Sequence, residues 1–321
     1  MIKDIPYKEI LPRVFVYPGL ISNHKEYSAI LDGLHNGKRK RYLFKEPENW
    51  SIFGTTMSYE ARFNETRLLE DVTKAMQENP ENEKDILAEK KMIEEIENAF
   101  LISTEHYLQH FQLTDAAKDW IISAPSYDRY TPTPEEHING KDHGQRLAMS
   151  HHSDYQIERE EMPGFKYVLT VTHYINDNYD GGEVRFLNSG KEVAYKPTAG
   201  DVIVFPSGNP KYLSDEGRYF HAVGAIEKSD KHFCRSFYTE YYEGSSEWLA
   251  NQEKYGADVW EKMEQVRIAA GLRSFKQDSD IQINKDGMTE IDIFINDILK
   301  NAGIDPEKEC GLEEFRKKDN E

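Results

Sequence analysis

The sequence predicts a mainly β core of jelly-roll type, with packing helices on its N-terminal side and a helical C-terminal extension. Short β-branched and aromatic runs separated by Gly, Pro and Asn turns fill the middle of the chain. This texture favours a β-sandwich or barrel over alternating βαβ units. Apolar stripes with helical spacing lie on both sides of it. We therefore divide the 321 residues into an N-terminal support (1–120), a core (121–244) and an extension (245–321).

The N-terminal region combines one extended segment with helices. Residues 14–17 have strand character, and residues 21–34 have helical character. A longer helix is predicted over 80–111, because Asn79 and Pro80 suit an N-cap and a first helical position. Its apolar residues recur at steps of three, four and seven, which predicts one stripe that packs on the core: Ile86, Ile93, Ile96, Phe100, Tyr107 and Phe111.

Four segments of the core have strand composition and turn residues at their ends. They are residues 167–175, 201–205, 219–226 and 232–242. After them, apolar residues at helical spacing predict one helix from Trp248 that ends near Gly271, and another over 291–302.

Composition excludes several classes of function. Forty Lys and Arg against 58 Asp and Glu give a formal net charge of −18, which argues against broad binding to a phosphate backbone. No apolar run approaches the roughly 20 residues of a membrane span. The two cysteines, Cys234 and Cys310, form no metal-spaced pair and no disulfide framework. We expect a cytoplasmic protein with neither nucleic-acid nor membrane partners.

One short motif has the composition of a metal site. His152 and Asp154 are two positions apart, so on an extended segment both side chains point to the same face and can reach one ion. A third ligand must come from elsewhere, and the downstream candidates are His173, His221 and His232. Two histidines and one carboxylate are typical of non-haem Fe(II) oxygenases.

The last predicted strand carries a cation that needs an anion. Arg235 shares a face with Phe237 and Thr239, and an arginine that points into a small barrel is costly without an anionic partner. A dicarboxylic acid would supply that anion through a bidentate contact. Lys231 is a weaker rival for the same carboxylate. On another strand, Tyr174 shares a face with Thr170, so hydroxyl groups are also available.

From about residue 126 to 242 the chain resembles the prolyl 4-hydroxylase-like branch of the Fe(II)/2-oxoglutarate-dependent dioxygenases. Several landmarks occur in the family's order: Arg129-Tyr130, His152-Ser153-Asp154, the strand 171–177, Gly181-Gly182-Glu183, the segment 196–206, His221 and Arg235. Two segments are longer than the family pattern. They are 131–149, which we interpret as a mobile loop near the metal, and 227–231, interpreted as a turn.

The resemblance implies a double-stranded β-helix that binds Fe(II), with 2-oxoglutarate and O2 as co-substrates and ascorbate as a reductant. By motif position, it implies these roles: His152, Asp154 and His221 as iron ligands; Arg235, Tyr174 and Thr170 as 2-oxoglutarate contacts; Tyr130 and Arg129 in the site wall.

The resemblance also implies an activity: hydroxylation of a prolyl residue in a peptide or protein, with release of succinate and CO2. The filled carboxylate position at Asp154 favours hydroxylation over halogenation, which needs that position empty. Two alternatives remain at this point. One is the same chemistry on a free amino acid, small metabolite or nucleobase, and the other is a non-catalytic jelly-roll binding module.

Overall fold

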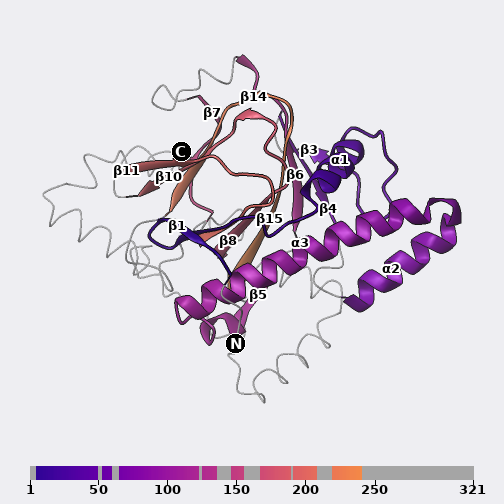
Figure 1. Ribbon diagram of the computed structural model, residues 1–321, viewed down its shortest axis with the longest axis horizontal. Coiled ribbons are helices and arrows are strands. Elements are labelled where there is room, and N and C mark those ends of the chain that lie inside the picture. The colour runs from indigo at the N-terminus through magenta and orange to yellow at the C-terminus, as the bar shows by residue number, and fades with distance from the viewer. Residues whose placement is uncertain are drawn as a thin grey trace, which may run out of the picture. The chain divides into compact units, whose positions relative to one another are not determined.

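The computed structural model describes residues 5–49, 53–59, 65–122, 125–135, 146–154, 167–188, 191–207 and 219–240. Within these ranges two antiparallel sheets face each other, and helices cover the outer face of the larger sheet (Figure 1). The predicted C-terminal helices after residue 245 lie outside the described residues, as do positions 136–145 of the predicted loop.

The larger sheet has the strand order β1-β2-β12-β8-β15-β6-β4-β3, and β5 pairs with β15. Every neighbouring pair in it is antiparallel. Its strands are β1 (Lys8–Leu11), β2 (Val14–Tyr17), β3 (Glu48–Asn49), β4 (Gly54–Ser58), β5 (Trp120–Ile122), β6 (Ser126–Tyr130), β8 (Tyr167–Tyr174), β12 (Val202–Pro206) and β15 (Lys231–Glu240).

The smaller sheet has the order β11-β10-β13-β7, and a separate pair joins β14 to β9. These strands are β7 (Leu147–His152), β9 (Asp180–Gly181), β10 (Val184–Asn188), β11 (Lys191–Tyr195), β13 (Phe220–Gly224) and β14 (Ile226–Lys228). The four strands predicted in the core are confirmed as β8, β12, β13 and β15. The two facing sheets confirm the mainly β, jelly-roll architecture.

The part of the chain that the structure describes has the α-helices α1 (His24–His35), α2 (Glu65–Glu78) and α3 (Glu83–His110). It also has the short 3₁₀ turns η1 (Pro80–Asn82) and η2 (Ala116–Asp119). The helix predicted from residue 80 thus begins as a 3₁₀ turn and becomes α-helical at Glu83. Helix α2 was not predicted, because its buried apolar residues (Leu68, Val72 and Ala75) are few within a polar segment. No helix in the described ranges is long and apolar enough to cross a membrane.

Two apolar cores lie on the two faces of the larger sheet. On the outer face, the predicted stripe of α3 is buried against the sheet, and Phe100 stacks on His173 of β8 with 6.3 Å between ring centroids. The inner core lies between the sheets and is rich in aromatic residues, including Tyr130, Tyr174, Phe186 and Phe205. Because side chains alternate along a strand, β8 and β15 supply both cores.

The turn around β9 depends on two glycines. Gly181 and Gly182 have φ of +68° and +67°, the left-handed region in which other residues are strained. A Cβ on Gly181 would lie 1.9 Å from the carbonyl oxygen of Ala225. These glycines therefore have a structural role in the turn. The turn also directs the Gly182 carbonyl toward Lys231 Nζ, at 2.8 Å.

A buried carboxylate on α3 makes stability depend on pH. Glu89 is fully buried, and its Oε2 accepts hydrogen bonds from the backbone amides of Tyr42 and Leu43. Burial raises the pKa of Glu89 to about 7, although the two amide donors and Arg39 lower it. A raised pKa means that folding favours the protonated form. The contribution of protonated Glu89 to folding stability is complete below about pH 4.5 and is lost as the pH rises through 7.

We expect Glu89→Gln to stabilise the protein above pH 7 and to have little effect near pH 5. The glutamine keeps an acceptor for the two amides but carries no charge, so the gain reaches at most about 3 kcal/mol. Urea unfolding between pH 5 and 8.5 measures it. Glu94→Gln, at an exposed position of the same helix, serves as the control. Parallel pH curves for wild type and Glu89→Gln would contradict this prediction.

Candidate metal centre and anion pocket

Three candidate ligands meet at one end of the smaller sheet. His152 is the last residue of β7, and Asp154 follows it by two positions. His221 lies on the adjacent strand β13, where its Cα is paired directly with that of His152. The antiparallel pairing therefore brings together side chains that are far apart in the sequence.

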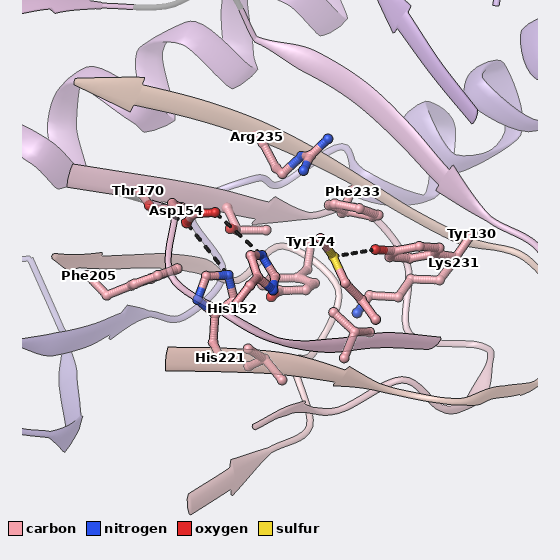
Figure 2. Close-up of a pocket in the computed structure, with 14 residues that line it drawn as sticks. Tyr130, His152, Asp154, Thr170, Tyr174, Phe205, His221, Lys231, Phe233 and Arg235 are labelled. Carbon is pink, nitrogen blue, oxygen red and sulfur yellow. Dashed lines mark hydrogen bonds and ion pairs between the residues drawn. The ribbon is translucent and has the colours of Figure 1, made fainter. Parts of the chain in front are cut away.

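The ligand atoms of these residues face one another. His152 Nε2 lies 3.5 Å from Asp154 Oδ1, and His221 Nε2 lies 3.6 Å from Asp154 Oδ2 (Figure 2). All three ligand atoms lie within 4.8 Å of one another. The spacing suits three donors that share one ion.

Backbone carbonyls orient both imidazoles. His152 Nδ1 is 2.9 Å from the carbonyl oxygen of Ser150, and His221 Nδ1 is 3.2 Å from that of Tyr219. Because a carbonyl can only accept, each Nδ1 carries the proton and each Nε2 presents a lone pair to the centre. This is the usual orientation of metal-binding histidines.

Asp154 is held in its ionised form. Thr170 Oγ1 donates to its Oδ2 at 2.6 Å, and Ser207 Oγ lies 2.8 Å from that hydroxyl. Burial tends to raise the pKa of Asp154, but the contacts with His221, His152 and Thr170 outweigh burial and keep this pKa well below its usual range. Burial lowers the pKa of His221 to about 4, so this imidazole is neutral at pH 7. Burial tends to lower the pKa of His152, but the contact with Asp154 outweighs burial and raises this pKa. With both Nε2 atoms unprotonated, the two imidazoles and the carboxylate would fit a divalent ion such as Fe(II).

A pocket extends from this centre between the two sheets. The smaller sheet and the segment after β7 supply the three candidate ligands, and the larger sheet supplies the opposite wall (Figure 2). Its lining residues are Tyr130, Met149, His152, Asp154, Thr170, Thr172, Tyr174, Val184, Phe205, His221, Val223, Lys231, Phe233 and Arg235. The predicted pairing of Tyr174 with Thr170 on one face of β8 is thus observed.

Lys231 is the buried cation of this pocket. It is 1% exposed, and its Nζ donates to the Gly182 carbonyl and lies 5.1 Å from the centroid of the Tyr174 ring. No carboxylate of the described residues forms an ion pair with it. Burial, together with the nearby Lys196, lowers the pKa of Lys231 to about 7. An anion bound in the pocket would pair with the buried ammonium and would raise the pKa of Lys231 again.

Arg235 also lines the pocket, but it already has a carboxylate partner. Its Nε donates to Asp128 Oδ2 at 2.7 Å, and Asp128 is fully buried. Sequence reasoning missed Asp128, whose strand β6 pairs with β15. Lys231 was named from the sequence as a rival to Arg235. Strand alternation places Lys231, Phe233 and Arg235 on one face of β15.

Other predicted residues lie elsewhere. Arg129 does not line the pocket, because it alternates with Tyr130 on β6 and pairs instead with Asp230 at 3.5 Å. His173 points to the outer core, and His232 lies beside Asp230, so neither competes with His221 for the third ligand position. Tyr130 lies in the pocket wall as expected, with its hydroxyl on Met149 Sδ at 3.2 Å.

Comparisons with known proteins find a family model that matches part of this chain. Residues 138–241 match the model of the 2OG-Fe(II) oxygenase superfamily. A PKHD-type hydroxylase of Prochlorococcus marinus is 27% identical over 138 residues, which cover 42% of this chain and 57% of the relative. The match therefore spans little more than half of that relative's length.

Solved structures to which this chain is similar include a dioxygenase for auxin oxidation from rice. It has a TM-score of 0.49 at 14% identity, covering 82% of this chain and 87% of that one. A prolyl-4-hydroxylase from Pseudomonas putida has a TM-score of 0.42 at 13% identity, and the match covers 71% of this chain and 92% of that one.

The family match and the His-Asp-His centre lie in the same segment of the chain, and the match includes all three candidate ligands. Over residues 138–241 the chain is therefore similar to the 2OG-Fe(II) oxygenase superfamily, for which Fe(II) and 2-oxoglutarate are the typical cofactor and co-substrate.

Proposed function

We propose that this protein is an Fe(II)- and 2-oxoglutarate-dependent hydroxylase whose iron is held by His152, Asp154 and His221. One observation carries the proposal: three oriented donors converge beside a pocket that contains a buried cation without a carboxylate partner in the described chain. A purely structural metal site does not need a buried cation beside it. The cation therefore argues against a non-catalytic binding module.

The pocket residues divide into two groups. The donors at one end would bind the metal, which would supply the chemistry of oxygen transfer from O2 to a substrate C–H bond, coupled to conversion of 2-oxoglutarate into succinate and CO2. At the other side, Lys231 would pair with the far carboxylate of 2-oxoglutarate, and Tyr174 would pack beside it. Thr170 would hold Asp154 in position rather than contact 2-oxoglutarate.

The geometry favours Lys231 over Arg235 as the anion anchor, because Asp128 already balances the charge of Arg235. In this arrangement Arg235 would shape the pocket wall from its fixed position. The role predicted for Arg235 from the sequence stays a prediction that binding experiments can decide.

For the substrate, we propose a prolyl residue of a peptide or protein. Support comes from the resemblance of residues 126–242 to the prolyl 4-hydroxylase-like branch and from the similarity to a PKHD-type hydroxylase. The acidic net charge of −18 would favour encounter with a basic peptide.

Anaerobic titration with Fe(II) and then 2-oxoglutarate tests the metal centre. We expect the weak visible charge-transfer band of the chelate in the wild type and its loss in His152→Ala. His151→Ala is a matched control, because the neighbouring imidazole points away from the centre and pairs with Glu192 at 3.4 Å. Absence of the band in wild-type protein that has bound iron would overturn the assignment of 2-oxoglutarate.

Substrate class is then tested by succinate release. Basic proline-containing peptides, matched peptides with alanine at the proline, free amino acids and nucleobases form the panel. We expect release above the uncoupled background, and a gain of one oxygen atom by mass spectrometry, only with the proline peptides. Turnover confined to a free amino acid or nucleobase would replace the prolyl proposal but keep the oxygenase.

A further inference from the structure

A second group of metal-binding side chains lies where α1 meets the start of β15. Asp32 belongs to the last turns of α1, whereas Asp230 and His232 lie at the end of the β14–β15 turn and in β15. One ligand atom from each of the three lies within 4.8 Å of the others.

His232 has no role in the interactions described so far. It is 2% exposed, and its Nδ1 is buried without a hydrogen-bond partner. A buried imidazole nitrogen without a partner has lost its hydration and gained nothing in return. Its ring forms no ion pair with Asp32 or Asp230 at 4.0 Å or less, although one ligand atom from each lies within 4.8 Å of the others. The ring of His35 lies beside it, with 5.7 Å between ring centroids.

Neighbouring donors fix both carboxylates. Asn36 Nδ2 donates to Asp32 Oδ1 at 2.8 Å, and Arg129 Nη1 lies 3.5 Å from Asp230 Oδ2. Arg129 also donates to Asn36. These contacts orient the ligands as an outer shell does around a metal. Besides Arg129, Lys38 acts electrostatically on Asp230, and Asp32 adds a second negative charge near it.

We propose that Asp32, Asp230 and His232 form a second site for a divalent transition metal, separate from the His152 centre. An imidazole nitrogen with two carboxylate oxygens suits Zn²⁺, Mn²⁺ or Fe²⁺, whereas Ca²⁺ and Mg²⁺ prefer oxygen ligands alone. The ion would tie α1 to β15. On that strand Lys231 points to the opposite face, into the pocket, so the second site would brace the strand that carries the proposed anion anchor.

Zinc content tests this site without reference to activity. Untagged full-length protein with His152→Ala and Asp154→Ala, which removes the first centre, is equilibrated with buffered Zn²⁺ and analysed by elemental mass spectrometry. We expect one zinc per chain, and none after further substitution by Asp32→Ala. Glu26→Ala, at an exposed position of the same helix, should keep the zinc. We also expect zinc to raise the melting temperature of the double variant, and Asp32→Ala to abolish that rise.

Two results would overturn the proposal. One is a double variant that retains no zinc, and the other is zinc that persists after both Asp32→Ala and His232→Gln. If His232→Gln does not fold, the Asp32→Ala comparison decides alone. Every protein in the zinc experiment lacks the first centre. A negative zinc result therefore does not contradict the proposed hydroxylase, and a negative charge-transfer titration does not contradict the second metal site.

Discussion

Lys231→Ala is expected to weaken 2-oxoglutarate binding by roughly 30-fold to several thousand-fold, without preventing Fe(II) binding. Truncating one partner of a buried charge pair costs about 2–5 kcal/mol, which corresponds to that range of Kd. The ammonium of Lys231 is 1% exposed and has no carboxylate partner among the described residues, so in the free protein it remains uncompensated. Anaerobic titration of the iron-loaded variant, followed by the charge-transfer band, gives the Kd directly.

Lys228→Ala is the matched control, because this lysine is close in sequence but exposed and paired with Asp180. We expect its Kd for 2-oxoglutarate to equal that of the wild type. If Lys231→Ala binds 2-oxoglutarate normally, the anchor proposed here is wrong. The prediction of Arg235 from the sequence would then be the better one.

Two of the three candidate metal ligands could be predicted from the sequence because they lie only two positions apart. His152 and Asp154 share a face through the two-residue period of an extended strand, and this period does not depend on the rest of the fold. Spacing alone left His173, His221 and His232 open as the third ligand, and the family resemblance implied His221. The structure agrees, since His173 packs against Phe100 on the other face of the sheet.

The choice between Lys231 and Arg235 could not be settled in that way. Both lie on the same face of β15, so periodicity treats them alike. What distinguishes them is Asp128, which belongs to β6 and is brought near Arg235 only by the pairing of two strands far apart in sequence. Helix α2 was missed for a related reason, because its stability depends on packing against α3 more than on its own composition.

The pairing of Arg235 with Asp128 leads to the second large effect: we expect Arg235→Ala to destabilise the fold by about 3–5 kcal/mol. Asp128 is fully buried, its Oδ1 has no hydrogen-bond partner, and without Arg235 its Oδ2 would retain only Ser126. Urea unfolding of the variant measures the loss, and adding Asp128→Ala should recover part of it, because no unpaired carboxylate then remains.

Arg185 offers a matched comparison for the same experiment. Its side chain is 25% exposed, close to the 28% of Arg235, but its partners Glu183 and Glu192 are themselves about one quarter exposed. Water can replace Arg185 at those carboxylates, so Arg185→Ala should cost about 1 kcal/mol or less. An equal cost for the two variants would show that Asp128 does not need its arginine. If Arg235→Ala were stable but no longer bound 2-oxoglutarate, Arg235 would be assigned to the co-substrate. We expect instead that Arg235→Ala loses stability and keeps its affinity for 2-oxoglutarate.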